Sequence, residues 1–385
     1  MLARNAVARV GAELVPYSAV DASPRLESMI NLQSNYPVLA EQDVAWKQQV
    51  HEAVERFGAE SLRLPPFGGT LQNRTVAAAW LKLPVERTWI CTSGHHGTMA
   101  ALLAAGLPGK TIAVEALTYP WFLRQTHMLG MRVVPVHLDK DGIDPNALRA
   151  ACGRETIAAL YTMPTMHNPT SRTTSLCRRH DVADVAHQFG LTIIEDAAYG
   201  FLVADESPRY TELAPENAFY IESLSKRVSP GLRTCFLAGP AALADPIALA
   251  LRVMASGSST LLTSLGCAMV ENGSLAHVIE AKRAEGRARN SKALAILTRL
   301  NVETDPNSWH LWVTLPETSG LTAQTVEALC EKHGVLITGA HWFTAPGTGV
   351  PRAVRLGLGG ETSWERVAKG LQLFAHLLQP QAVPA

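Results

Sequence analysis

Short apolar runs alternate with longer stretches of mixed apolar and polar residues from about residue 75 to residue 240. The short runs are rich in β-branched residues and are bounded by turn residues, a pattern typical of buried strands. This pattern predicts seven strands, at 87–93, 111–116, 132–138, 157–162, 191–197, 217–223 and 235–240.

The stretches between several of these strands have helical character, as in 97–106 (GTMAALLAAG) and 176–190 (LCRRHDVADVAHQFG). Alternating strands and helices predict an α/β fold with a mostly parallel seven-stranded sheet covered by helices on both faces. We assign this large domain to residues 46–279. In such sheets the ligand binds beyond the carboxyl ends of the strands.

The pattern changes after residue 280. A smaller α+β domain is predicted there, because two strands and two helices follow one long helical run. The segments are a helical run at 276–300, a strand at 310–316, a helix near 322–333, apolar segments at 334–338 and 352–359, and a final helix. Residues 1–45 precede the α/β pattern, so we group them with 280–385 in this small domain.

The chain has 385 residues, with 34 basic and 34 acidic side chains and a formal net charge of zero. This length allows a large core, and the balanced charge does not indicate nucleic-acid or membrane-surface binding. The six cysteines form no CxxC pair, which argues against a zinc site or a disulfide framework and favours a reducing compartment. No run approaches the roughly 18 apolar residues of a spanning helix, and the N-terminus lacks the apolar core of a signal peptide. We therefore expect a soluble cytoplasmic protein without a metal site.

The segment 222–234, ESLSKRVSPGLRT, overlaps the end of a predicted strand and places Lys226 between two serines and seven residues before Arg233. A solvated turn is one interpretation, because most lysines are exposed and Ser, Pro and Gly form turns. The other is a nucleophilic amine beside an anion site, since a desolvated lysine forms Schiff bases and arginine suits phosphate. A lysine imine next to a phosphate site is what pyridoxal phosphate requires.

A second candidate phosphate site follows the strand at 87–93, where Gly94, His95 and His96 begin a predicted helix. Free N–H groups and the positive end of the helix dipole favour an anion at such a position. An ordinary helix start capped by Ser93 is the alternative. Adjacent residues on a helix do not face the same way, so we do not expect the two histidines to share a metal.

Three more strands are followed by side chains suited to a planar heterocycle. Tyr119 could stack on a ring, although a core tyrosine at a turn fits equally well. Asn168, in an Asn-Pro turn, could donate its amide to a ligand oxygen. Asp196 ends a buried strand and needs a partner, either a protonated ring nitrogen or, as an N-cap, a helix N–H group. Tyr199 lies three residues further on and could reach the same site.

Together these segments resemble fold-type I pyridoxal-phosphate enzymes. The motifs NPT (168–170), EDAAYG (195–200) and SLSKRVSPGLR (223–233) occur in the order found in class I/II aminotransferases. Within these, the chain is most similar to the aminotransferase-like domain of the MocR group. The similarity runs from about Ile30 to the C-terminus.

The resemblance implies a role for each candidate residue. Lys226 would form the internal aldimine and move a proton between the substrate Cα and C4′ of the cofactor. Asp196 would pair with the pyridine nitrogen, and Tyr119 would stack on the ring. The other expected cofactor-binding residues are Asn168 and Tyr199 at the ring hydroxyl, Gly94, His95, Ser223 and Arg233 at the phosphate, and His96 and Ser225.

The resemblance also implies where the substrate binds. The segment 352–359, RAVRLGLG, is similar to the one whose arginine binds the substrate α-carboxylate. The match falls on Arg355, with Arg352 as the alternative. Asn35 and Tyr36 lie on a segment that contacts substrate in the family. Family members are usually homodimers with active sites at the subunit interface.

Several positions depart from the family pattern. Leu64 stands where a tyrosine usually reaches into the neighbouring subunit. Ser171 replaces the glycine of NPTG, and Asn35 replaces the glycine of an early G-x-P. No catalytic group is removed, so these departures concern the substrate and the outcome of the reaction.

The leading interpretation is an aminotransferase of amino acid metabolism or biosynthesis, which moves the amino group of an α-amino acid to a 2-oxo acid. Decarboxylation, elimination, cyclisation or oxidation on the same cofactor stay open, because the sequence does not show which Cα bond breaks. A catalytically idle sensor is a third interpretation, which the presence of Lys226, Asp196 and Arg355 disfavours. Direct DNA binding is not expected, because the residues before the α/β pattern lack a basic recognition helix. A nicotinamide dehydrogenase is set aside because no G-x-G-x-x-G follows an early strand. Trp121, Phe201 and Trp342 indicate a bulky or apolar substrate side chain.

Overall fold

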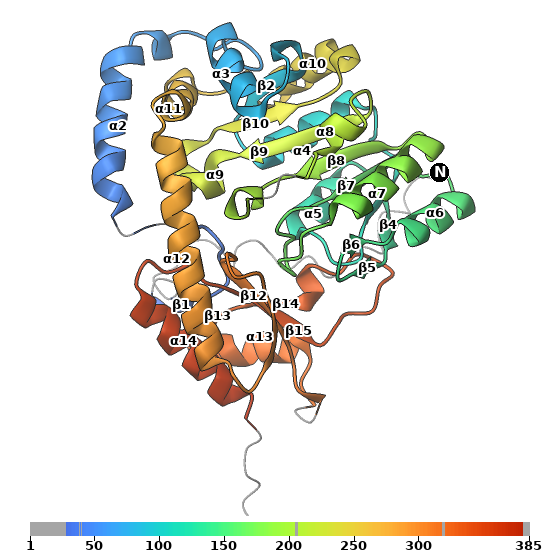
Figure 1. Ribbon diagram of the computed structural model, residues 1–385, viewed down its shortest axis with the longest axis vertical. Coiled ribbons are helices and arrows are strands. Elements are labelled where there is room, and N and C mark those ends of the chain that lie inside the picture. The colour runs from blue at the N-terminus through green and yellow to red at the C-terminus, as the bar shows by residue number, and fades with distance from the viewer. Residues whose placement is uncertain (1–27, 38, 40, 205–206, 318–319, 380–385) are drawn as a thin grey trace, which may run out of the picture.

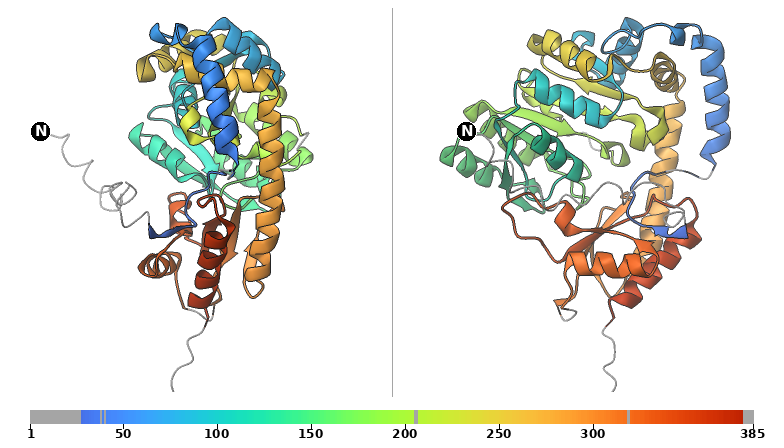
Figure 2. Two further views of the ribbon diagram at one scale, coloured as in Figure 1. Left: turned by 90° about the vertical axis from the view of Figure 1, so that its left-hand side faces the viewer. Right: turned by 180° about the vertical axis from the view of Figure 1, so that it is seen from behind.

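The computed structural model describes residues 28–379 except 38, 40, 205–206 and 318–319. The expectation that the chain begins without a signal peptide therefore lies outside the described residues. A large sheet with its helices occupies one end of the molecule, and a small sheet occupies the other (Figure 1). The long helix α12 (Ser274–Ile296) extends along both parts, as the two further views in Figure 2 also show.

The large sheet confirms the predicted α/β fold, because all seven expected strands are present in one sheet. Every pairing between neighbours is parallel except those of the strand at 235–238, which runs antiparallel to both of its neighbours. Strands buried on both faces are expected to be nearly continuous apolar runs, as these are. In sheet order the strands are β2 (Thr88–Cys91), β10 (Cys235–Ala238), β9 (Ala218–Ser223), β8 (Thr192–Asp196), β7 (Ala159–Thr162), β3 (Thr111–Glu115) and β4 (Arg132–Val136).

Helices cover both faces of this sheet and form two apolar core clusters. Their ends follow local sequence signals: the Ser93 hydroxyl accepts a hydrogen bond from the His96 N–H at the start of α4, and Gly190 ends α7 with φ 66°. The helices are α3 (Leu71–Leu81), α4 (Gly94–Ala104), α5 (Pro120–Met128), α6 (Pro145–Arg154), α7 (Leu176–Phe189), α8 (Tyr210–Leu213), α9 (Leu224–Arg227), α10 (Ala244–Ala255) and α11 (Thr260–Glu271).

The small sheet has the strand order β11-β12-β15-β14, and helices pack against it. The N-terminal segment joins this part of the molecule, because β1 pairs in parallel with β13. This pairing supports grouping residues 1–45 with 280–385, while the boundaries at 45/46 and 279/280 stay a prediction. The elements are β1 (Ile30–Asn31), β11 (Asn301–Glu303), β12 (His310–Thr314), β13 (Val335–Leu336), β14 (Thr338–Gly339), β15 (Ala353–Gly357), α13 (Ala323–Lys332) and α14 (Trp364–Leu377).

Two further connections complete the fold. Beyond the end of β3, Leu117 forms an isolated antiparallel bridge with Thr344, and the Thr118 N–H donates to the Phe343 carbonyl at 2.8 Å. This contact joins the large sheet to the small one next to Tyr119. The helix α2 (Gln42–Phe57) packs against α11, and a two-stranded hairpin, β5 (Leu138–Asp139) with β6 (Gly142–Ile143), extends from β4. Within the described residues, every helix is too short or too polar to cross a lipid bilayer.

Candidate active site

The predicted site residues meet at the carboxyl edge of the large sheet. β2 leads into Gly94, β8 ends at Asp196, and β9 ends at Ser223. Because β10 runs antiparallel, Arg233, two residues before it, lies at the same edge. The geometry follows the rule that ligands of such sheets bind beyond the carboxyl ends of the strands.

Asp196 is buried at the end of β8. Its Oδ2 accepts a hydrogen bond from the Tyr161 hydroxyl at 2.8 Å, and its Oδ1 accepts one from the Ala198 N–H at 3.0 Å. Burial raises the pKa of the Asp196 carboxyl, and these hydrogen bonds and the charge of Lys226 oppose the rise. The Ala198 contact is a local turn two residues long, and no helix begins at Asp196, so the N-cap interpretation is wrong. The side chain nevertheless faces Lys226 closely enough for their charges to interact.

Lys226 lies on the four-residue helix α9, which the Ser223 hydroxyl caps by accepting from the Ser225 N–H at 3.2 Å. Its Nζ atom stands 3.0 Å from the centroid of the Tyr36 ring and 5.6 Å from that of Tyr199. Loss of solvation and the charge of Arg355 hold the pKa of the Lys226 amine well below its usual range. The amine therefore has the electronic state that a nucleophile or a proton acceptor needs.

The expected phosphate-binding residues surround the start of α4. Gly94 lies next to Ser223, the last residue of β9: a Cβ atom at position 94 would stand 3.5 Å from the Ser223 Cβ, an ordinary van der Waals contact. Arg233 adopts a left-handed backbone conformation with φ 49° just before β10. The charges of Lys226 and Arg233 both reach His95. The surrounding protein partly desolvates its ring although the side chain is accessible, and the pKa of His95 is lowered first by this desolvation and then by the two charges.

The two adjacent histidines point in different directions. His96 is buried, and its Nδ1 accepts a hydrogen bond from the Thr92 N–H at 3.2 Å. His95 is exposed, and its Nε2 lies 2.9 Å from the Tyr119 hydroxyl. The contacts of His96 are with its own helix start, so its assignment to the cofactor stays a prediction.

Tyr119 caps the N-terminal end of α5, at the contact between the two sheets. Its ring centroid is 5.7 Å from that of His95, in a tilted arrangement. Burial is the main cause that raises its pKa well above the usual tyrosine range. The phenol is therefore neutral and lies beside His95, and the stacking role of its ring stays a prediction.

Asn168 and Arg355 connect the two sheets. Asn168 follows β7, and its Oδ1 accepts a hydrogen bond from Arg355 Nη1 at 2.9 Å. Arg355 lies in the middle of β15, where its Nη2 donates to the Gln33 carbonyl at 2.5 Å. Its guanidinium stands 5.0 Å from the Phe343 ring centroid. Both side chains are buried, so the fold places a cation at the edge of the cofactor site.

Arg352, the alternative to Arg355, lies outside this site. Its Nε donates to the Leu321 carbonyl at 3.2 Å, and its Nη2 donates to the Pro316 carbonyl at 3.0 Å. These contacts belong to a loop of the small sheet. The geometry therefore favours Arg355 as the carboxylate-binding arginine.

The N-terminal segment covers Lys226. The Asn35 carbonyl accepts a hydrogen bond from the Tyr199 hydroxyl at 3.2 Å, and the Asn35 Nδ2 stands 2.9 Å from His310 Nδ1. Burial, followed by the charge of Arg355, lowers the pKa of His310 to about 3, so its ring is neutral. Tyr36 extends from the same segment over the Lys226 amine. The residues predicted to contact substrate are thus adjacent to the reactive lysine.

The departures from the family pattern fall in two different places. Ser171 is buried with φ 62°, and its Oγ is 2.8 Å from Ser308 Oγ, which ties the NPT turn to the small sheet. The Leu64 side chain is 74% exposed and therefore makes no comparable buried contact. Ser171 is thus integrated into the fold, whereas Leu64 is available to a neighbouring molecule.

The aromatic residues taken to indicate an apolar substrate have separate environments. Phe201 is buried and packs 5.2 Å from the Arg227 guanidinium. The Trp342 Nε1 donates to Glu327, and Arg124 lies 5.8 Å from the Trp342 ring. Of the three aromatic residues, Trp121 has a ring contact with a predicted cofactor-binding residue. Its side chain is 42% exposed, and its ring centroid is 6.3 Å from that of His95.

Sequence reasoning missed three residues that contact this site. Tyr161 supports Asp196, His310 holds Asn35, and Lys282 donates to the backbone of α9. Tyr161 lies inside a predicted strand, and Lys282 lies inside a predicted helix, so neither position carried a local signal. Their contacts arise from residues distant in sequence.

The residues present fit pyridoxal phosphate. The buried carboxylate of Asp196 suits the ring nitrogen of that cofactor, and the Lys226 amine, with its lowered pKa, suits its aldehyde carbon. The phosphate would be met by Gly94, Ser223 and Arg233, near the start of α4. Two buried polar atoms, Arg355 Nε and Asn35 Oδ1, have no hydrogen-bond partner among the described residues. Such atoms are costly unless a ligand satisfies them.

Comparison with known proteins agrees with the fold. A solved alpha-aminoadipate aminotransferase from Thermus thermophilus, complexed with N-(5'-phosphopyridoxyl)-L-leucine, superposes with a TM-score of 0.81 at 23% identity, covering 94% of this chain and 95% of that one. An archaeal alanine:glyoxylate aminotransferase superposes with a TM-score of 0.82 at 21% identity, covering 94% and 92% of the two chains. At these identities the similarity establishes the fold, which confirms the fold-type I prediction.

Sequence relatives include both enzymes and regulators. The 2-aminoadipate transaminase of Thermus thermophilus is 29% identical over 325 residues, which cover 78% of this chain and 79% of that enzyme. The HTH-type transcriptional regulator YdeF of Bacillus subtilis is 31% identical over 297 residues, covering 76% of this chain and 63% of the regulator. A second B. subtilis regulator, YdfD, is 30% identical and is covered over 52% of its length. The chain therefore spans about half to two thirds of these two regulators.

The family model for aminotransferases of class I and II matches residues 27–371, which is nearly the whole chain. The predicted motifs and the geometry at the sheet edge agree with this match. The chain belongs to the pyridoxal-phosphate-dependent aminotransferases of class I and II.

Proposed function

We propose that this chain transfers the amino group of an α-amino acid to a 2-oxo acid, with pyridoxal phosphate as its cofactor. One observation carries the proposal. The charges of two buried groups, the Asp196 carboxylate and the Arg355 guanidinium, both act on the Lys226 amine, whose pKa is lowered. This arrangement would supply a proton acceptor and an electron-sink partner from the large sheet and a carboxylate-binding group from the small sheet.

The bound cofactor supplies an electron sink for the bonds at the substrate Cα. Asp196 would hold positive charge at the ring nitrogen, and Tyr119 would contact the ring. Asn168 and Tyr199 orient the ring oxygen, while Lys226 provides covalent attachment through Nζ. The proposed anion contacts are Gly94, His95, His96, Ser223, Ser225 and Arg233.

The substrate is proposed to bind between the two sheets. Arg355 receives the α-carboxylate through its guanidinium, and Asn35 and Tyr36 close the site on the side of the N-terminal segment. Once the amino group of the substrate has replaced Nζ on the cofactor, the released neutral amine of Lys226 would accept the Cα proton of the amino acid. The exposed Trp121 beside His95 supports a substrate with an apolar or bulky side chain.

A second candidate function is the sensing of pyridoxal phosphate or an amino acid. It is favoured by one observation, that two curated relatives are described as transcriptional regulators. Other reactions of the same cofactor at Cα form a third possibility, because the contacts described do not select one Cα bond. The expected absence of nucleic-acid binding and the cytoplasmic location stay predictions; the six free cysteines support the latter.

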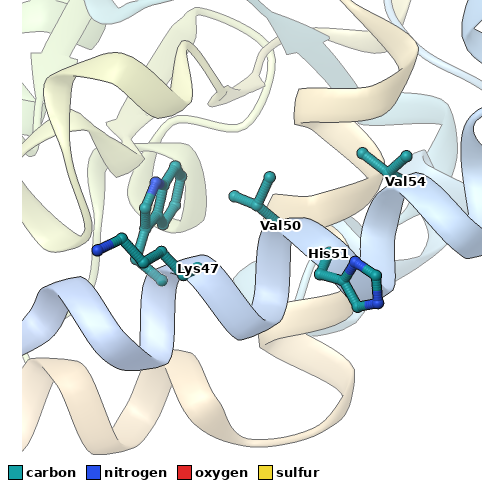
Figure 3. Close-up of a pocket in the computed structure, with 5 residues that line it drawn as sticks. Lys47, Val50, His51 and Val54 are labelled. Atoms are coloured by element: carbon teal, nitrogen blue, oxygen red, sulfur yellow. The ribbon is translucent and has the colours of Figure 1, made fainter.

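The chain is also proposed to act as a homodimer. Leu62 and Leu71 are 88% and 70% exposed, and Leu64 lies between them in sequence. Nearby in sequence, α2 carries a shallow groove of about 370 Å³ lined by Trp46, Lys47, Val50, His51 and Val54, and the last four are labelled in Figure 3. Exposed apolar surface of this kind is typical of a subunit interface.

Sedimentation analysis tests the dimer. The wild-type chain is expected to sediment as a dimer, and the double variant Leu62→Glu/Leu64→Glu as a monomer, because buried charge opposes association. Met128→Glu, at a side chain 79% exposed on α5, is the matched control and should stay dimeric. A monomeric wild-type chain would contradict the proposal.

The function is tested with the visible absorption of the purified protein during additions of single amino acids. Bleaching by one amino acid, with release of its 2-oxo acid, supports transamination and identifies the donor. A spectral change without bleaching or 2-oxo acid indicates another reaction or a sensor. Release of carbon dioxide, or release of the amino group as free ammonia rather than its transfer, would contradict transamination while keeping the cofactor.

A further inference from the structure

Lys282 is a completely buried lysine on α12, directly beneath the lysine-bearing helix. Its Nζ donates to the Lys226 carbonyl at 3.0 Å and to the Val228 carbonyl at 2.7 Å. No carboxylate of the described residues lies within ion-pair distance of this amine. Its hydrogen bonds are thus made to two backbone carbonyl groups.

These two carbonyls close the end of α9. The last carbonyls of any helix lack partners within the helix, and a cation there is favourable. The helix α9 has only four residues, so Lys226 itself belongs to its last turn. The Val228 carbonyl also accepts from Gln42 Nε2 of α2 at 2.8 Å. Lys282 and Gln42 therefore fix the backbone that carries the reactive amine.

Hydrogen bonding alone does not require a lysine here. A buried cation without a counter-ion is costly, and this cost lowers the pKa of Lys282 to about 7. A neutral donor could satisfy the same carbonyls without that cost. A lysine differs from a neutral donor by its positive charge, which here lies near Lys226. The charges of Lys282 and Arg355 both lower the pKa of the Lys226 amine.

We propose that Lys282 is a positioning residue for Lys226, fixing its main chain through two hydrogen bonds and disfavouring positive charge on its Nζ atom. This inference rests on the proposed function, in which Lys226 holds the cofactor. Asp196 acts on Lys226 in the opposite sense. Lys282 and Arg355 together counterbalance that carboxylate and keep the amine ready to accept a proton.

The test is a pH titration of the visible absorption of the cofactor-loaded full chain, whose midpoint reports positive charge on Lys226 Nζ. Lys282→Gln keeps a donor but removes the charge. We expect its midpoint to rise by about half a pH unit, equivalent to about a threefold change in the protonation equilibrium. The effect is small because, of the charges that act on the Lys226 amine, that of Lys282 has the weakest influence on its pKa. Lys282→Arg retains the charge and is expected to keep the wild-type midpoint.

Arg283→Met is the matched structural control. Arg283 is the next residue of α12 and also donates to two backbone carbonyls, those of Phe201 at 2.6 Å and Val203 at 3.1 Å. Its loss should lower the melting temperature without moving the midpoint. Equal midpoints for Lys282→Gln, Lys282→Arg and wild type would overturn the inference while leaving the proposed function intact. Absence of any visible cofactor band in the wild-type chain would instead overturn the proposed function, and the inference with it.

Discussion

The carboxyl edge of the large sheet and the facing surface of the small sheet form the two sides of one site, but they are constructed differently. On the large sheet, Asp196 and Lys226 directly follow or end predicted strands within short motifs. On the small sheet, Arg355 lies in the middle of a strand and gains its role through contact with Asn168. Asn35 and His310 meet although they are 275 residues apart.

The two sides differ in how far the local sequence determines the groups that form them. The cofactor side uses groups fixed by their position after a strand, so local sequence determines them. The proposed substrate side consists of buried contacts between distant segments, and the departures at Asn35 and Ser171 lie there. We therefore expect changes on the large sheet to affect catalysis of every substrate, and changes on the small sheet to affect substrate affinity.

Lys226→Ala should have the largest effect, on the cofactor side. Removal of the proton acceptor is expected to lower kcat about a thousandfold or more for every amino acid used. Steady-state kinetics with several donors measures this loss, and borohydride reduction followed by peptide mass analysis should find the cofactor on residue 226 in the wild type only. Lys110→Ala, at an exposed lysine, is the control. A variant that kept full turnover would disprove the role of Lys226.

Arg355→Leu tests the substrate side. Two charge-assisted hydrogen bonds to a carboxylate would be lost at roughly 1.5–3 kcal/mol each, so kcat/KM should fall about a hundredfold or more. The loss should appear mainly in KM, with the affinity for the cofactor nearly unchanged. Arg352→Leu, on the same segment but with its guanidinium on a surface loop, should keep the wild-type KM. The opposite ranking would transfer the assignment to Arg352.

Glu327→Gln tests the connection between the two regions. Glu327 on α13 accepts from Trp342 Nε1 at 3.1 Å, and burial raises its pKa from 4.5 to about 7. Between pH 4.5 and 7 the folded carboxyl holds a proton that the unfolded chain has lost. Stability from this group therefore decreases as the pH rises through this window. The glutamine variant should melt a few degrees higher than wild type at pH 8 and equally at pH 4.5, by calorimetry. An equal difference at both pH values would refute this explanation.

Ser171 should give the smallest effect. Ser171→Gly removes the left-handed strain at φ 62° but also the hydrogen bond to Ser308. Each contributes about 1 kcal/mol with opposite sign, so the free energy of unfolding should change little. Ser171→Ala keeps the strain and loses the bond, and it should destabilise the protein by about 1 kcal/mol. Urea unfolding of the two variants and the wild type measures both contributions. Equal stabilities of the two variants would show that the left-handed conformation at residue 171 costs nothing, and an alanine variant as stable as the wild type would show that the Ser308 contact contributes nothing.

Local patterns in the sequence were enough to predict the seven strands, the parallel character of the large sheet and the residues at its carboxyl edge. Apolar runs specify buried strands, and capping and turn residues such as Ser93 and Gly190 set helix ends. The motif residues then came together because parallel strands end at one edge. Only the order of strands was needed to place Asp196 and Lys226 near each other.

Packing between distant segments settled which arginine faces the site, where the two histidines point and which groups support the reactive lysine. Arg352 and Arg355 differ by three residues in sequence, yet strand packing buries one and turns the other to a loop. Lys282 lies 56 residues from Lys226, and its helical surroundings gave no sign of a contact. Such contacts depend on how helices and sheets pack, because the free energy of a buried charge is set by neighbours that the sequence places far away.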